Sequence, residues 1–217
     1  MKKQTKIALS ILAAAALAGC ASAPTPADLD KMAAAVVKAS FRDQGIVKTA
    51  VLDPEEVNVA CTEADVAGQP LSTERLTELQ NAQLKTIKWP ADGKYMGDWK
   101  KGEALAQSGR GLTWTDDEKT PNGGNCYNCH QITPTEISFG TIGPSLLGYG
   151  KDRGVTADPT SPAAKAIIEY TWGKIWNAKA YNACSSMPRA VHKGIITEAQ
   201  AKDLMALLLS PDSPVNK

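Results

Sequence analysis

The feature that most constrains this chain is a five-residue cluster near its middle, Cys126-Tyr127-Asn128-Cys129-His130. Two cysteines at positions i and i+3 lie on the same face of a helical turn, so both thiols can point at one object. A histidine directly after the second cysteine completes the pattern C-x-x-C-H, which is typical of covalent c-type haem attachment. We therefore predict that Cys126 and Cys129 hold one haem through thioether bonds, with His130 as an axial ligand of its iron.

A cysteine pair also has other uses, which the rest of the sequence disfavours. A zinc site would need a second C-x-x-C or a distant histidine pair, and the chain has only His130 and His192. A thioredoxin-type pair would need a βαβ context, which the sequence does not show. A disulfide or zinc pair beside an incidental histidine is the alternative to the haem interpretation.

The iron needs a second axial ligand unless it binds substrate. Met187 is followed by Pro188 in a loop between two predicted helices, and the proline stiffens the backbone there. We predict Met187 as this ligand, with His192 as the alternative. Three other methionines are predicted packing residues or precede a helix: Met32, Met96 and Met205.

The surroundings of the iron ligands can also be predicted. A ligating histidine usually donates its other ring N–H to a carbonyl or carboxylate, and the carbonyl of Pro144 is the candidate, although an ordinary turn would also use this proline. A neutral thioether from Met187 favours ferrous iron and a raised potential. With both axial positions filled, the sequence predicts electron transfer rather than catalysis at the haem.

The first residues have the pattern of a bacterial export signal. Three lysines precede an apolar run over residues 7–18, which at twelve residues is too short to span a bilayer core of roughly 30 Å. The run ends in Leu17-Ala18-Gly19-Cys20, which resembles a lipoprotein processing site. We predict that 1–19 is a signal peptide, that Cys20 is lipidated and that 20–30 is a tether, which gives a periplasmic, lipid-anchored protein without a spanning helix. Ordinary cleavage after Ala23 is the alternative.

Two cysteines remain, Cys61 and Cys184. Unpaired thiols are unusual in an oxidising compartment, so the simplest prediction is one disulfide between them. It would tie the N-terminal extension to the loop that carries Met187. A bond to a partner subunit or a reactive thiol are the alternatives.

Composition and periodicity predict an all-α protein. A net charge of +1 offers no basic excess, so we expect no nucleic-acid partner. The segment 97–217 is predicted to be a cytochrome domain of three helices and long loops, whose core would be thin unless a cofactor fills it. The segment 31–96 is an N-terminal extension that we expect to dock a partner. Helices are expected at 29–41, 72–87, 99–108, 162–177 and 198–209, with short strands at 47–52 and 57–61.

The stretch from Gly97 to Lys217 resembles class I cytochromes c, and its tail resembles the SoxX family, the monohaem subunits of the SoxAX cytochromes of bacterial sulfur oxidation. The resemblance covers a little over half the chain. It is carried by Gly97-Asp98, Gly102, CYNCH, Gly143-Pro144, Met187-Pro188-Arg189, the segment His192 to Thr197, Leu207-Leu208-Leu209 and the segment Pro211 to Asn216.

This resemblance implies a class I cytochrome c fold and a place in an enzyme complex, an L-cysteine S-thiosulfotransferase. The complex joins thiosulfate to a cysteine of the carrier SoxYZ and releases two electrons. The catalytic cysteine is expected on the partner subunit SoxA, and no catalytic residue on this chain. This subunit would pass the electrons to a soluble cytochrome c.

The chain departs from the family pattern in three places. The loop 109–125 is longer than usual, the extension 21–96 lies outside the common haem module, and Leu207 stands where cytochromes c commonly place an aromatic residue against Gly102. Two other functions are compatible with this sequence. One is a periplasmic monohaem cytochrome c that serves another dehydrogenase or oxidase, and the other is a cysteine-rich lipoprotein without haem.

Overall fold

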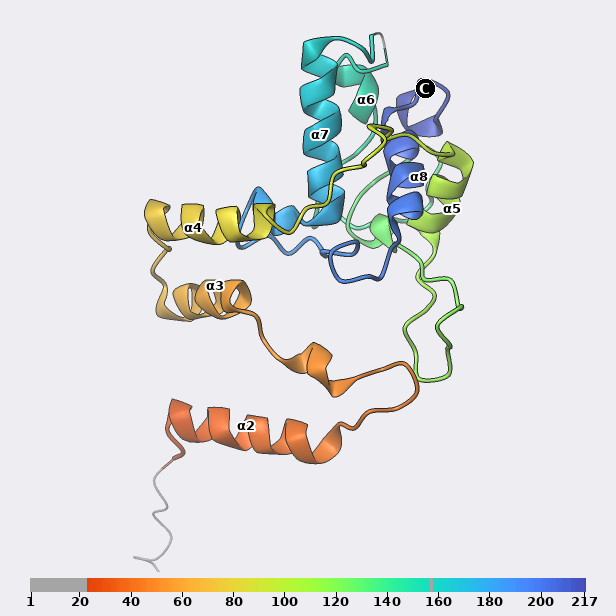
Figure 1. The fold of residues 1–217 in the computed structure, drawn as a ribbon. Helices are drawn as coiled ribbons and strands as arrows, with labels where there is room; N and C mark the ends of the chain where they lie inside the picture. Colours follow the sequence, from red (N-terminus) through yellow and green to blue (C-terminus); the bar gives the residue numbers. More distant parts are fainter. Residues whose placement is uncertain (1–22, 157) are drawn as a thin grey trace, which may run out of the picture. The chain divides into compact units, whose positions relative to one another are not determined.

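The computed structural model describes residues 23–156 and 158–217, and within them every regular element is a helix (Figure 1). The single sheet-like feature of these residues is an isolated bridge between Gln44 and Val47. The all-α prediction is therefore confirmed. The α-helices are α2 Pro26–Ser40, α3 Glu56–Ala67, α4 Thr73–Leu84, α5 Trp99–Gln107, α6 Tyr149–Asp152, α7 Pro162–Trp176 and α8 Glu198–Leu209. The 3-10 turns are η1 Thr49–Leu52, η2 Cys126–Asn128, η3 Ala178–Ala180 and η4 Pro214–Asn216.

The chain divides into two units, Met1–Asp43 and Gln44–Lys217. The described part of the first unit is dominated by α2. Its N-terminus has a capping box in which the Thr25 hydroxyl accepts from the Asp28 N–H and the Asp28 carboxylate accepts from the Thr25 N–H. No residue of α2 is buried, and Met32, a predicted packing residue, is 58% exposed.

The core of the second unit is built from α5, α7 and α8, and the chain after α4 packs against it. Trp172 on α7 is fully buried, and its indole N–H donates to the Lys88 carbonyl at 2.8 Å. Trp176, one turn later, donates in the same way to the Thr86 carbonyl at 3.1 Å. The sequence predicts an extension over 31–96 beside a separate domain from 97, but the structure divides after Asp43, so residues 44–96 are packed with the predicted cytochrome domain.

Helices α5 and α8 cross at very close range. A Cβ placed on Gly102 would collide with the backbone carbonyl of Asp203 and lie 3.0 Å from the Leu207 Cβ. Only a residue without a side chain permits this approach of the two helices. The crossing is also fastened before α5 begins, where the Gly97 N–H donates to the Lys202 carbonyl at 2.9 Å. Gly102 and Leu207 therefore face one another, so the leucine takes the place that the family resemblance gives to an aromatic residue.

The prediction of strands at 47–52 and 57–61 is wrong. The first segment is the 3-10 turn η1 and the second is the start of α3. Valine at 57 and 59 favours strand locally, but a single buried position, Val57, is enough to seat α3 as a helix against Leu79 of α4. Tertiary packing therefore overrides the local propensity.

Helices α4, α5, α7 and α8 lie close to where they were expected, because their caps are explicit in the sequence, whereas the short helix α6 was not predicted. Ser161 and Pro162 begin α7, and the capping box of Thr197 and Gln200 begins α8. The predicted ends differ by one residue for α5 and α7 and by three for α4. Helix α2 begins three residues before the prediction, at Pro26, because its Thr25 cap lies in the predicted tether.

Candidate functional site

The C-x-x-C-H segment forms a single tight turn. The η2 turn follows Asn125, which has a left-handed φ of 52°, a conformation that asparagine tolerates better than most residues. The Cys126 carbonyl accepts from the N–H groups of Cys129 at 3.1 Å and of His130 at 3.0 Å. Both cysteines are free thiols. The turn thus presents two unpaired sulfur atoms and an imidazole together.

These side chains line a cavity of about 580 Å³. That volume is in the range of about 300–1,000 Å³ that is usual for pockets which bury small molecules and cofactors. Its other walls come from the chain around Pro144, the inner face of α7, the loop that carries Met187, and α8, and they are mainly apolar. The predicted haem-site residues that line it are Cys126, Cys129, His130, Pro144 and Met187.

The His130 ring is oriented by the backbone that follows it. Its Nδ1 lies 2.7 Å from the Pro144 carbonyl oxygen, which can only accept, so Nδ1 donates this hydrogen bond and Nε2 is the ring nitrogen left to bind a ligand. A Cβ on Gly143 would fall onto the imidazole ring. The sequence predicted the Pro144 contact but missed why position 143 must be glycine.

The structure separates the candidates for a second axial ligand. Met187 is half-buried and lines the cavity, whereas His192 does not. Of the alternatives among the described residues, Met205 is fully buried in the core and Met96 is 40% exposed, and neither lines the cavity. Met187 is therefore the described methionine that shares a cavity with His130.

Burial raises the pKa of the Cys126 thiol to about 11. The cause is the apolar wall around the sulfur, which disfavours the thiolate, with a smaller contribution in the same direction from Cys129. At neutral pH the Cys126 sulfur is thus a protonated thiol. This is unlike the activated thiolates of cysteine enzymes, which lie in electropositive surroundings.

Two cations face the same cavity without an anionic partner. In the described part of the chain, neither Arg153 nor Lys174 makes an ion pair with a carboxylate, and both line the cavity. The Arg153 guanidinium lies 3.9 Å from the centroid of the Tyr149 ring. Burial lowers the pKa of Lys174. An apolar cavity with two unpaired cations fits an apolar macrocycle that carries two carboxylates, as haem does. Sequence reasoning did not single out these two residues.

The predicted disulfide is present. Cys61 of α3 and Cys184 are joined with an S–S distance of 2.04 Å, and Cys184 also lines the cavity. The bond therefore connects α3 to the loop that carries Met187.

The long loop 109–125 is closed at its base by backbone hydrogen bonds. The N–H of Gly123 donates to the Arg110 carbonyl at 2.8 Å, and that of Asn125 donates to the Ser108 carbonyl at 2.9 Å. Gly124, at the end of the loop, lines the cavity just before Cys126. Closure of the base therefore fixes where the C-x-x-C-H turn begins.

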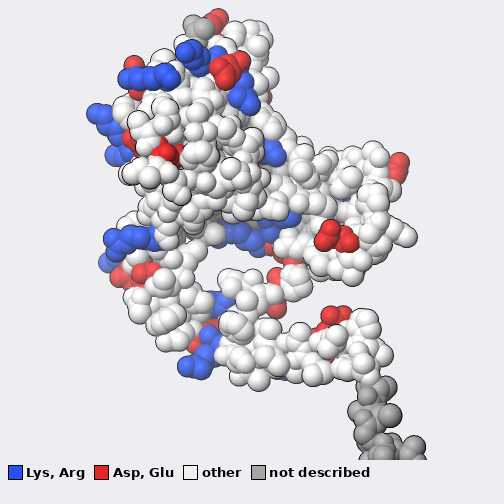
Figure 2. Space-filling view, turned by 180° about the vertical axis from the view of Figure 1, so that it is seen from behind, with Lys and Arg blue, Asp and Glu red and all other residues white. Residues whose placement is uncertain are grey.

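Among residues 23–156 and 158–217, no group of three or more histidine, cysteine or acidic side chains is placed to hold a metal ion. None of the helices in this same part of the chain is long and apolar enough to cross a membrane. Basic and acidic side chains are interspersed with uncharged areas on the face drawn in Figure 2.

Comparison with known proteins gives one informative relative. No protein-family model matches the chain. A protein of Aquifex aeolicus (strain VF5) named "Uncharacterized lipoprotein" is 39% identical over 133 residues, which cover 61% of this chain and 59% of the relative. The chain thus matches less than two thirds of the length of this relative. The name agrees with the predicted lipid anchor, and Cys20 itself lies outside the described residues.

Proposed function

We propose that this chain is a lipid-anchored monohaem cytochrome c that transfers electrons one at a time. The observation that supports it most directly is that two free thiols, an oriented imidazole and a methionine line one apolar cavity. Haem, when bound there, would supply the one-electron chemistry of the Fe²⁺/Fe³⁺ couple.

Each residue has a defined part in this proposal. The thiols of Cys126 and Cys129 would each form a carbon–sulfur bond to the macrocycle, and His130 would offer its free Nε2 to the iron. Met187 would offer its thioether sulfur on the other side. With His130 and Met187 both bound to the iron, substrate would have no place there, and the group would supply electron transfer alone.

A class I cytochrome c fold is part of the proposal. Supporting it are the close crossing of α5 and α8 at Gly102 and the contact of His130 with the Pro144 carbonyl. The lipid anchor at Cys20 is supported by the Leu17-Ala18-Gly19-Cys20 segment and by the lipoprotein relative. We infer that the protein works at a membrane surface in the periplasm.

More narrowly, we propose that the chain is the SoxX-type electron-relay subunit of a thiosulfate-oxidising SoxAX complex. The support is the resemblance of the Met187-Pro188-Arg189 segment and of the tail after it. In that reaction a carrier thiol and thiosulfate form a sulfur–sulfur bond and release two electrons and one proton. This chain would accept the electrons in single steps from its SoxA-type partner and pass them to a soluble cytochrome c.

Expression of the full chain with a haem-attachment system tests the first proposal. We expect the absorption bands of low-spin c-type haem, together with the weak far-red charge-transfer band of methionine-ligated ferric iron. Met187→Ala should lose the far-red band, whereas Met96→Ala should keep it. A far-red band that survives Met187→Ala would show that another residue is the ligand.

Purification with partners tests the second proposal. We expect the chain to co-purify with a SoxA-type cytochrome and to become reduced when that complex receives thiosulfate and SoxYZ. A haem-loaded chain that binds no such partner and is not reduced by thiosulfate would instead be a periplasmic cytochrome c of another respiratory route.

A further inference from the structure

The loop that carries Met187 has little support of its own. It runs from η3 to α8 without a regular helix, and Met187 itself is held locally by a hydrogen bond from its N–H to the Ser185 hydroxyl at 3.2 Å. On one side of Met187, three residues away, Cys184 is bonded to Cys61 of α3. On the other side, two residues away, is Arg189.

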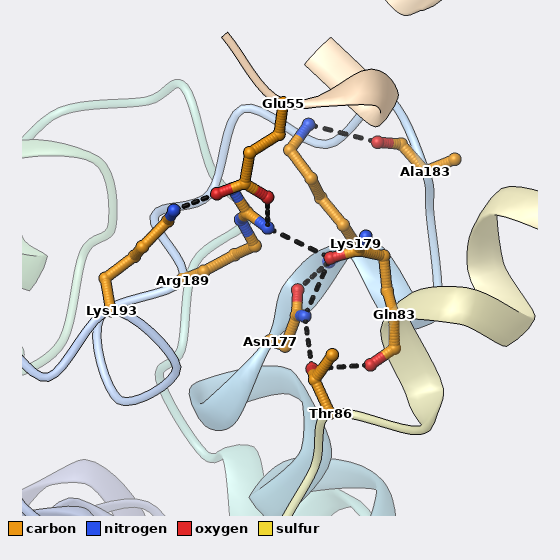
Figure 3. A network of polar contacts seen from close by, with 8 residues as sticks. All are labelled: Glu55, Gln83, Thr86, Asn177, Lys179, Ala183, Arg189 and Lys193. Atoms are coloured by element: carbon orange, nitrogen blue, oxygen red, sulfur yellow. Dashed lines mark hydrogen bonds and ion pairs between the residues drawn. The ribbon is translucent and has the colours of Figure 1, made fainter. Parts of the chain in front are cut away.

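Arg189 is the most deeply placed charge around this loop. Its side chain is 6% exposed, and its Nη1 donates to the Glu55 carboxylate at 2.7 Å and to the Gln83 side-chain oxygen at 3.0 Å (Figure 3). A buried guanidinium is tolerated only where it is paired and hydrogen-bonded. The two acceptors come from the residue that caps α3 and from α4, which lie more than a hundred residues earlier in the chain.

The same network also holds Asn177, just before the loop, and Lys193, within it. Glu55 also pairs with Lys193, which follows Arg189 by four residues. Gln83 accepts a second hydrogen bond, at 3.0 Å, from the side chain of Asn177, the fully buried residue that precedes η3. Figure 3 shows these side chains converging between the loop and the residues from α3 and α4.

We propose that Glu55 and Arg189 are positioning residues for the Met187 iron ligand, and that α3 and α4 are a brace for the ligand loop. This inference rests on the proposed haem function. A thioether is a weak ligand without charge, and a ligand site requires its groups to be held within about 0.5 Å. The ion pair and the disulfide fix the chain on both sides of Met187, so loss of the pair would let the methionine leave the iron while His130 stays bound.

The test uses the full, haem-loaded chain with Glu55→Gln. This change keeps the size of the side chain but leaves Arg189 buried without a counter-charge. We expect most of the far-red charge-transfer band to disappear. We also expect carbon monoxide to bind the ferrous protein roughly tenfold faster, the factor that corresponds to loss of one charge-assisted hydrogen bond.

The reduction potential distinguishes loss of the methionine ligand from simple removal of a charge, because the two effects change the potential in opposite directions. Removal of a nearby carboxylate destabilises ferric iron and by itself raises the potential, whereas loss of the thioether lowers it. We expect the potential of Glu55→Gln to fall. The matched control is Glu56→Gln, which removes the same charge from an exposed pair with Arg75 and should keep the band and the carbon monoxide rate.

A second variant distinguishes loss of the brace from misfolding caused by a buried, unpaired charge. Glu55→Gln combined with Arg189→Gln removes both charges, so no unpaired ion is buried, and it should still lose the far-red band. Should both variants keep the band, rate and potential of Glu56→Gln, the brace is refuted while the haem function stands. Should the unmodified chain carry no haem, the proposed function itself fails.

Discussion

The backbone of Gly143 lies against the His130 ring so closely that a methyl group there would overlap the imidazole. The next residue supplies the carbonyl that holds the ring at Nδ1. Gly143 therefore fixes the position of the His130 ring, and Pro144 fixes which ring nitrogen donates a hydrogen bond to the backbone.

Gly143→Ala should displace His130. We expect the variant to lose about 1–3 kcal/mol of stability, as overpacked sites do, and to yield a smaller fraction of haem-loaded protein. Denaturant unfolding and the ratio of haem to protein absorbance measure the two effects. Thr141→Ala, two residues earlier and exposed, is the control and should behave like the unmodified chain. Normal haem loading of the Gly143→Ala variant would contradict the tight fit.

The Cys126 thiol should be unreactive in chain that has not received haem. With a pKa of about 11, roughly one molecule in a thousand carries the thiolate at pH 8, and that fraction rises with pH until it passes 11. Alkylation by iodoacetamide, followed by peptide mass spectrometry, should therefore be slow at pH 8 and accelerate steeply towards pH 11. In haem-loaded chain neither Cys126 nor Cys129 should react at any pH. Rapid labelling of Cys126 at pH 8 would contradict the buried, neutral thiol.

At the residue scale, the sequence predicted what local spacing can reveal. The cysteine pair, His130 and the Pro144 carbonyl lie within twenty residues of one another and follow a known pattern. Arg189 and Glu55 are separated by 134 residues, and neither has a neighbour that marks it as buried. Such a pair becomes visible only when the fold brings α3 against the loop.

Among the elements, the crossing of α5 and α8 gives the sharpest prediction. In an isolated helix, replacement of glycine by alanine stabilises by up to about 1 kcal/mol, because alanine has the higher helix propensity. Gly102→Ala should instead destabilise the protein, since the added Cβ meets the Asp203 carbonyl. Urea denaturation measures the change in unfolding free energy, and its sign tests this prediction. A stabilised variant would show that the helices are not in this close contact.

The elements also show where sequence patterns succeed and where they fail. Helices α7 and α8 were predicted within one residue because serine, proline and a capping box mark their starts. At the start of α3 the valines favour a strand. The N-cap residue, Glu55, makes no side-chain capping bond, so no cap marks the beginning of this helix. The side chain of Glu55 is instead used in the ion pair with Arg189.

For the whole unit Gln44–Lys217, the disulfide is the longest covalent constraint. It links residues 123 positions apart, for which loop-closure entropy gives a stabilisation of up to about 5 kcal/mol. Removing both sulfurs, as Cys61→Ser with Cys184→Ser, should lower the unfolding free energy by a large part of that amount. Guanidinium denaturation of the haem-loaded protein measures it, and an unchanged midpoint would contradict the pairing.

The boundary between the two units, after Asp43, could not be predicted from composition. Residues 44–96 look like an extension because they lie outside the haem motifs, yet Trp172 and Trp176 bind the carbonyls of Lys88 and Thr86 and join this segment to α7. The residues that each indole contacts lie 84 and 90 positions away in sequence, a distance over which periodicity carries no information.

The central claim is that one haem is covalently held by the turn at Cys126–Asn128 and the cysteine after it. The most direct measurement is the mass of the mature full chain made with a haem-attachment system, followed by its tryptic peptides. We predict a gain of one haem on the peptide that contains Cys126 and Cys129, lost only when both are changed to serine. A mature chain of unmodified mass at this peptide, with two alkylatable thiols, would contradict the account.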